Sequence, residues 1–132
     1  MIVLDSNIFF SALIKDSITR KLILDYPGKF LFPAYIFEEF EKHRDEILEK
    51  SVLEKEAFET LMGLILDKMI IIPDNVLVKH SKEAIEIAKD IDINDAVFIA
   101  AVLAYPGSVL WSNDKKLKKA GVKVISTEEM MR

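Results

Sequence analysis

The chain has 132 residues, no cysteine, two histidines and a formal net charge of −4, so we expect one domain, residues 1–132, without disulfides or thiolate metal sites. No apolar run reaches the length of a membrane span and the N-terminus lacks a signal-peptide pattern, which predicts a cytoplasmic protein with no membrane association. The negative charge also argues against a dedicated nucleic-acid binder, because such proteins are usually basic.

Short apolar runs and helical patterns alternate along the whole chain. In chain order we predict a strand at Ile2–Leu4, helices at Asn7–Ile14 and Ile18–Tyr26, a strand at Phe30–Phe32, helices at Tyr35–Lys50 and Leu53–Lys68, a strand at Met69–Ile72, helices at Asn75–Asp90 and Asp95–Ala104, a strand at Val109–Trp111, a helical turn at Lys115–Ala120, a strand at Val122–Ile125 and a C-terminal helical turn. The alternation predicts an α/β fold, a three-layer α/β/α sandwich around a central, mostly parallel sheet.

Several local signals mark where these helices begin and end. Asp16 or Ser17 is expected to separate the first two helices. Asn94 is expected to cap the apolar helix, and Thr127 the C-terminal turn. The apolar side of the helix at residues 75–90 is expected to carry Val78, Ala84, Ile85, Ile87 and Ala88.

Aspartates follow two of the predicted strands and open one predicted helix. Asp5 follows the first strand, Asp114 comes shortly after the fourth, and Asp95 opens the apolar helix, with Asp92 one turn earlier. Carboxyl ends of parallel strands and the helix N-termini that follow them lie at one edge of a sheet, where ligands bind. Carboxylates that meet there repel one another unless a cation neutralises them. With no cysteine and few histidines, that cation is expected to be Mg²⁺ or Mn²⁺, held by oxygen.

Each aspartate also has a purely structural interpretation. Asp5 could cap the first helix, and Asp95 could be an ordinary acid of a first helical turn. Asp92 and Asp114 could each stabilise a turn, which for Asp92 is the favoured interpretation. The placement of all of them at one edge is what favours a site.

Four segments in order resemble the PIN-domain family of metal-dependent ribonucleases, which includes the VapC-like toxins. The first is an apolar run leading into Asp5, Ser6 and Asn7, and the second places an acid before Phe40 in a helix. The third and fourth are Asp92–Ala101, a small-residue helix beginning at an aspartate, and Val109–Leu117, a strand followed by a serine, a spacer and an aspartate. The resemblance covers essentially the whole chain.

The resemblance implies an endoribonuclease with catalytic residues Asp5, Glu39, Asp95 and Asp114. Glu39 is preferred to Glu38 and Glu41 because Phe40 follows it. The implied ligands of Mg²⁺ or Mn²⁺ are Asp5, Asp95 and Asp114, and the implied supporting residues are Ser6, Asn7, Asp92 and Ser112.

The resemblance also suggests partners. It implies an RNA substrate, an antitoxin protein and a homodimer, and Lys115 and Lys116 are candidate phosphate contacts beside Asp114. Two alternatives stay open: a PIN scaffold without catalysis, and a receiver-like Mg²⁺-binding regulatory domain. The receiver is disfavoured because the last strand ends on Ser126 rather than on a lysine.

Overall fold

The computed structural model describes residues 1–14 and 18–132, and in these a single sheet of five strands is formed. The strands are β1 (Ile2–Leu4), β2 (Phe30–Pro33), β3 (Met69–Ile72), β4 (Val109–Trp111) and β5 (Val124–Ile125). Their order is β3-β2-β1-β4-β5, and every neighbouring pair is parallel. The predicted parallel sheet is therefore confirmed.

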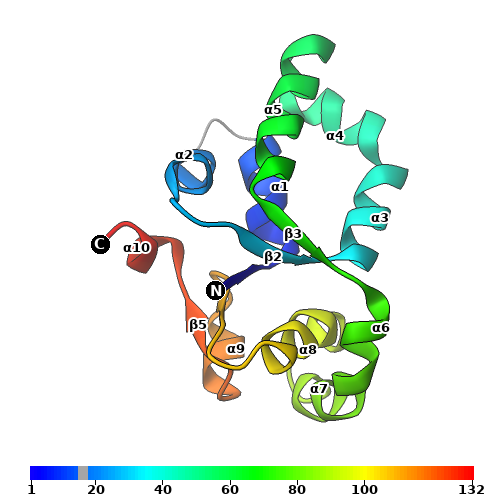
Figure 1. Ribbon diagram of the computed structural model, residues 1–132, viewed down its shortest axis with the longest axis vertical. Coiled ribbons are helices and arrows are strands. Elements are labelled where there is room, and N and C mark those ends of the chain that lie inside the picture. Colours follow the sequence, from blue (N-terminus) through cyan, green and yellow to red (C-terminus); the bar gives the residue numbers. More distant parts are fainter. Residues whose placement is uncertain (15–17) are drawn as a thin grey trace.

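Helices cover both faces of the sheet, which confirms the predicted three-layer fold. The helical segments are α1 (Ser6–Ile14), α2 (Ile18–Asp25), α3 (Ala34–Lys42), α4 (Arg44–Ser51), α5 (Lys55–Asp67), α6 (Asp74–Leu77), η1 (Val78–His80), α7 (Ser81–Ala88), η2 (Ile93–Asp95), α8 (Ala96–Ala104), α9 (Lys115–Lys119) and α10 (Thr127–Met130). Figure 1 shows α1–α5 on one side of the sheet and α6–α9 on the other. Right-handed crossovers produce this division, because the chain steps outward through β2 and β3 and then returns past β1 to β4 and β5.

Two predicted helices are interrupted in the structure. The helix predicted at Tyr35–Lys50 ends at Lys42 and a new one begins at Arg44, because His43 leaves the helical conformation with φ −111° and ψ 19°. The single helix predicted at Asn75–Asp90 is three segments, α6, η1 and α7. The tighter 3-10 turn of η1 changes the helical phase, so Val78 is 64% exposed although it was expected on the buried side. The predicted break at Asp16 or Ser17 lies outside the described residues.

Within α7, only some of the side chains that were predicted to be buried are buried. Ala84 and Ala88 are fully buried, whereas Ile85 is exposed.

None of the helices in the described ranges combines the length and apolar character needed to cross a bilayer.

A group of aromatic rings packs α1 against the sheet. The Phe9 ring is fully buried and stacks on Phe32 of β2 at a centroid distance of 4.6 Å. Phe40 of α3 meets it edge-on at 5.4 Å, and the adjacent Phe10 does so at 6.0 Å. The backbone N–H of Phe9 also donates to the carbonyl of Asp5. This packing therefore fixes the start of α1, directly after β1.

Replacing Phe9 with alanine should destabilise the protein strongly. Because the ring is fully buried among other rings, Phe9→Ala should lower the free energy of unfolding by about 3–5 kcal/mol in urea titrations. Phe10→Ala is the matched control, since Phe10 is only half-buried, and it should cost clearly less. Equal losses in the two variants would contradict the assignment of Phe9 to the core.

Candidate active site

The carboxyl ends of β1 and β4 lie side by side in the centre of the sheet. Ile2 pairs with Val109 and Leu4 with Trp111, and the Asp5 N–H donates to the carbonyl of Trp111 at 3.3 Å. The strand order reverses between these two strands, because β2 lies on one side of β1 and β4 on the other. The residues that follow them, Asp5 and the segment 112–114, thus meet in the crevice where open α/β sheets bind ligands.

Asp5 is both a helix cap and a member of this crevice. Its side chain is buried, and its Oδ1 accepts a hydrogen bond from the N–H of Ile8 at 2.8 Å, which satisfies a free donor at the start of α1. Burial raises the pKa of this carboxyl above its ordinary value, and the charge of Asp114 raises it further. Hydrogen bonds from Ser112 and from the N–H groups of Ile8 and Asn7 oppose the rise. The two interpretations of Asp5 are therefore compatible.

Ser112 connects the two strand ends. It is 1% exposed, and its hydroxyl donates to the Asp5 carboxylate while its Oγ accepts the N–H of Asp114 at 3.1 Å. Asp114 in turn caps α9, because its Oδ1 accepts the N–H of Lys116 at 2.9 Å. A single buried hydroxyl thus holds the Asp5 side chain and the backbone of Asp114 together.

Asp95 lies within electrostatic reach of the other aspartates. It ends η2, just before α8, and its side chain is half-buried. Burial raises the pKa of Asp95 to about 6, with further contributions from Asp92, Asp114 and Asp5 and a small opposing effect of Lys116. We call Asp5, Asp92, Asp95 and Asp114 the aspartate group.

Asp92 keeps a capping role as well. Its Oδ1 accepts the N–H of Asn94 at 3.0 Å, which makes Asp92 the N-cap of η2. The prediction that Asn94 is the cap is wrong, because the 3-10 turn η2 begins at Ile93, directly after Asp92, and the residue before α8 is Asp95. Asp92, like Asp5, therefore both caps a helix and belongs to the aspartate group.

The aspartate group lines two surface pockets. One, of about 440 Å³, is lined by Asp5, Asn7, Ile8, Ser11, Asn113 and Asp114. The other, of about 490 Å³, contains Asp92 and Asp95 together with Ser6, Asn7 and Tyr35. Asn7 lines both, so the pockets lie on either side of the start of α1. Ser11 and Asn113 were not singled out in the sequence; Ser11 follows Asn7 by one helical turn, which is the spacing that could have indicated it.

The donor chemistry of the group fits a hard divalent cation. All four side chains offer carboxylate oxygen, and no Lys, Arg or His of the described residues forms an ion pair with any of them. Such unneutralised carboxylates favour Mg²⁺ or Mn²⁺. Within residues 1–14 and 18–132, however, no three acidic or histidine side chains converge closely enough to hold one ion in this conformation.

Glu39 lies apart from the aspartate group. Its side chain on α3 is 38% exposed and forms an ion pair with Lys42 at 3.3 Å. Neither aspartate pocket includes it among its lining residues. The structure places Asp5, Asp92 and Asp114 within electrostatic range of Asp95, whereas Glu39 lies apart from them and its catalytic role stays a prediction.

Comparison with protein families gives a match that covers nearly the whole chain. The family described as the PIN domain matches residues 3–132. No curated protein matches the chain in the corresponding search.

The raised pKa of Asp95 predicts a pH-dependent stability of the metal-free protein. The folded state holds this proton up to about pH 6, whereas the carboxyl ordinarily loses it near 3.8. Between these values the folded state binds more protons than the unfolded state, so the free energy of unfolding falls as pH rises. In EDTA, Asp95→Asn should therefore melt at a higher temperature than the parent protein at about pH 7.5, and the difference should shrink toward about pH 4.5.

Differential scanning calorimetry at these two pH values would measure the effect. Asp45→Asn is the control, because Asp45 is exposed and its helix, α4, lies on the other side of the sheet from α8, the helix that follows Asp95. A melting difference that is the same at both pH values would contradict the prediction.

Proposed function

The chain belongs to the PIN domain family, whose members are generally nucleases that use divalent metal ions, and on this premise we propose that it is a metal-dependent endoribonuclease that hydrolyses RNA phosphodiester bonds. The observation that carries the proposal is the pairing of Asp5 with Asp114 through the buried Ser112 hydroxyl at the β1/β4 crevice.

The proposed ligands of Mg²⁺ or Mn²⁺ are Asp5, Asp95 and Asp114, and the proposed role of Asp92 is to support them through its charge beside Asp95. When bound, the ion would act as a Lewis acid on the phosphodiester and would activate water. The protein's contribution is to hold the ligands: Ser112 and the N–H of Ile8 orient Asp5, and α9 fixes Asp114 at its own N-terminus. Ser6 lines the pocket of Asp92 and Asp95, and Asn7 lines both pockets.

Lys116 supports an RNA substrate despite the negative net charge. It is exposed, it forms no ion pair among the described residues, and its charge acts on Asp95. Lys115 is also exposed and precedes it on α9. We propose that both contact phosphates on either side of the cleaved bond.

The biological setting also belongs to the proposal. We infer a cytoplasmic toxin of a toxin–antitoxin pair, acting as a homodimer and inhibited by an antitoxin. An apolar groove lined by Tyr35, Leu77, Val78, Ile85 and Val97 supports binding to another protein. Light scattering of the purified chain, alone and co-expressed with the product of a neighbouring reading frame, would test both partners.

Removing a carboxylate ligand should abolish RNA cleavage. Asp5→Asn and Asp95→Asn should each lower kcat by more than about 100-fold, since even groups that only support metal ligands typically contribute 10–100-fold. Cleavage of a defined RNA pool should require Mg²⁺ or Mn²⁺ and stop with EDTA. Asp95→Asn is the sharper variant, because it should lose activity while gaining stability.

Two control variants separate the site from its surroundings. Asp45→Asn should cleave at the parent rate, and Glu38→Gln serves as the neighbour control for Glu39→Gln. Unchanged activity in both aspartate variants would indicate a contaminating nuclease. A parent protein that binds RNA but never cleaves it would favour the scaffold without catalysis.

Replacing Lys116 should weaken RNA binding in a salt-dependent way. In EDTA, where no cleavage occurs, Lys116→Gln should reduce the slope of log K against log salt by ~0.7 for single-stranded RNA, the value for one lost phosphate contact. Fluorescence anisotropy of a labelled oligonucleotide would measure it. Lys55→Gln on α5 is the control, because Lys55 is exposed and α5 lies on the opposite side of the sheet from α9; equal slopes for the two variants would contradict the assignment.

A further inference from the structure

The four residues after the middle of β4 point alternately in two directions. In extended backbone successive side chains lie on opposite sides. Ser112 and Asp114 face the aspartate group. Trp111 and Asn113 donate hydrogen bonds to the C-terminal helix α10, and Asn113 also lines the pocket that contains Asp5 and Asp114.

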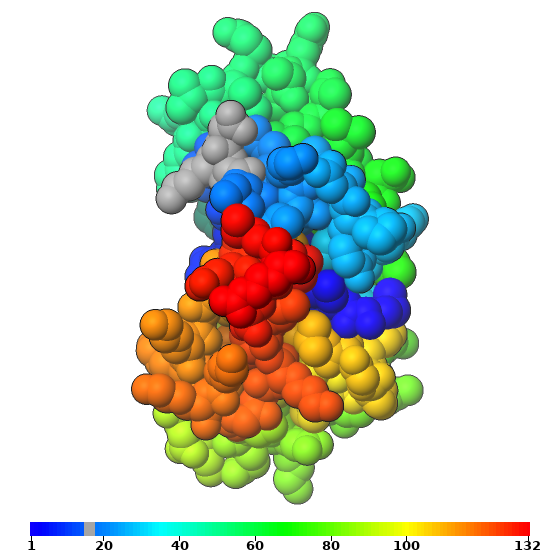
Figure 2. Space-filling view, turned by 90° about the vertical axis from the view of Figure 1, so that its left-hand side faces the viewer, coloured from blue at the N-terminus to red at the C-terminus, as the bar shows by residue number. Residues whose placement is uncertain are grey.

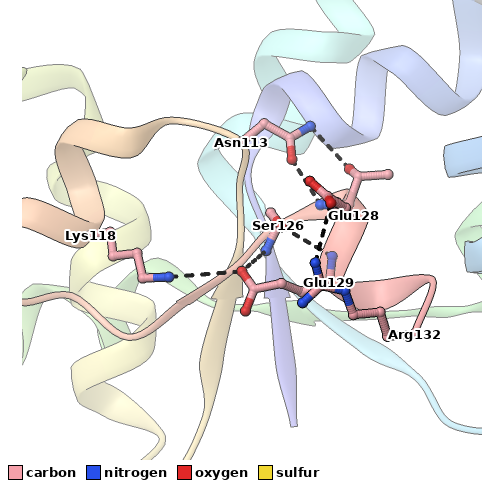
Figure 3. A network of polar contacts seen from close by, with 7 residues as sticks. Asn113, Lys118, Ser126, Glu128, Glu129 and Arg132 are labelled. Atoms are coloured by element: carbon pink, nitrogen blue, oxygen red, sulfur yellow. Dashed lines mark hydrogen bonds and ion pairs between the residues drawn. The ribbon is translucent and has the colours of Figure 1, made fainter.

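Thr127, the first residue of α10, receives both of these side chains. Its Oγ1 accepts one hydrogen bond from Trp111 Nε1 and another from Asn113 Nδ2, each at 3.0 Å. Its backbone N–H donates to Asn113 Oδ1 at 2.8 Å. Figure 3 shows the Asn113 side chain facing the first turn of α10. We call Trp111, Asn113 and Thr127 the C-terminal clamp.

The short helix that carries Thr127 is itself fixed. Ser126 and Glu129 form a reciprocal capping box at its start, so the prediction that Thr127 is the cap is wrong by one residue. Glu129 also pairs with Lys118 of α9 at 4.0 Å. Figure 2 shows the C-terminal residues, in red, on the surface against the orange segment that contains α9. The chain is therefore joined to α10 both before Asp114, through Asn113, and after it, through Lys118 of α9.

We propose that Thr127 is a positioning residue for Asp114, and that the C-terminal clamp sets the backbone of residues 112–114 so that Asp114 faces Asp5. The proposal rests on the proposed function only for its catalytic consequence. Ser112 is the sole side chain among the described residues that accepts the Asp114 N–H, and the Ser112 N–H donates to the carbonyl of Ile125. Residue 113, between them, is held by its hydrogen bonds with Thr127. A purely structural role, in which the clamp only secures the chain end, predicts no effect on Asp114.

The metal-free protein offers the first test. Thr127→Val keeps the side-chain shape and the N–H but removes the accepting oxygen, while Thr127→Ser keeps that oxygen. Amide hydrogen exchange by NMR in EDTA would follow the N–H groups of Asp114 and Lys116, which donate to Ser112 and to the Asp114 carboxylate. Trp111 is the only tryptophan of the chain, so its single indole signal reports directly whether the clamp is broken.

We expect Thr127→Val to speed exchange at both amides at least about fivefold, because the loop loses a hydrogen bond that orders it. Thr127→Ser should stay within ~twofold of the parent, as should Thr60→Val, a matched change at an exposed position of α5. Normal exchange at both amides in Thr127→Val, together with a shifted indole signal, would overturn the proposal. If that variant fails to fold, Asn113→Ala, which leaves the bond between Trp111 and Thr127, decides by the same measurement.

RNA cleavage provides the second readout. Thr127→Val should lower kcat about 10- to 100-fold with KM for RNA nearly unchanged, and Thr127→Ser should restore it. A loss confined to KM would contradict positioning of a catalytic group. A parent protein without nuclease activity would refute the proposed function, whereas the exchange experiment would still decide the role of Thr127.

Discussion

The hydrogen bonds of the Ser112 hydroxyl are the constraint on which the rest of the site depends. This buried group joins Asp5, at the end of the first strand, to Asp114, after the fourth. The sheet makes the contact possible, because β1 and β4 are neighbours although most of the chain lies between them. The aromatic packing around Phe9 fixes one half of the crevice and the C-terminal clamp fixes the other.

The aspartate group destabilises an otherwise well-packed fold locally. Burying carboxylates near one another raises the pKa of Asp5 and of Asp95, which means that ionisation of these residues opposes folding at neutral pH. Conflicts of this kind are expected at functional sites, where local stability is lost for chemistry. Mutual repulsion also favours separate positions for bare carboxylates, in keeping with two adjacent pockets rather than one closed set of ligands. A divalent ion would reverse the sign of this interaction.

The sequence predicted what topology alone determines. Apolar runs located all five strands, and an aspartate after a strand could be placed at one edge of the sheet without knowing any contact. The sequence did not predict the features that depend on local backbone geometry. The break at His43 and the 3-10 turn at η1 depend on backbone angles for which no Gly or Pro gave a signal. The contact between Asn113 and Thr127 joins two loops, and no periodicity in the sequence indicates it. Glu39 was selected from three nearby acids on resemblance, and helical spacing could not show which of them faces the crevice.

Net charge is a poor guide to the partners of such a site. The chain carries −4 overall, yet charges interact over only ~10 Å at moderate salt, so a polyanion would sense the charges around the crevice rather than the total. Those charges are the aspartate group and the exposed lysines of α9, which begins at Asp114. A divalent ion in the group would offset two of its negative charges and leave the lysines of α9 as the nearest cations. The same surface would then bind a phosphate backbone more weakly without metal than with metal, which links the strength of RNA binding at the crevice to occupancy of the site.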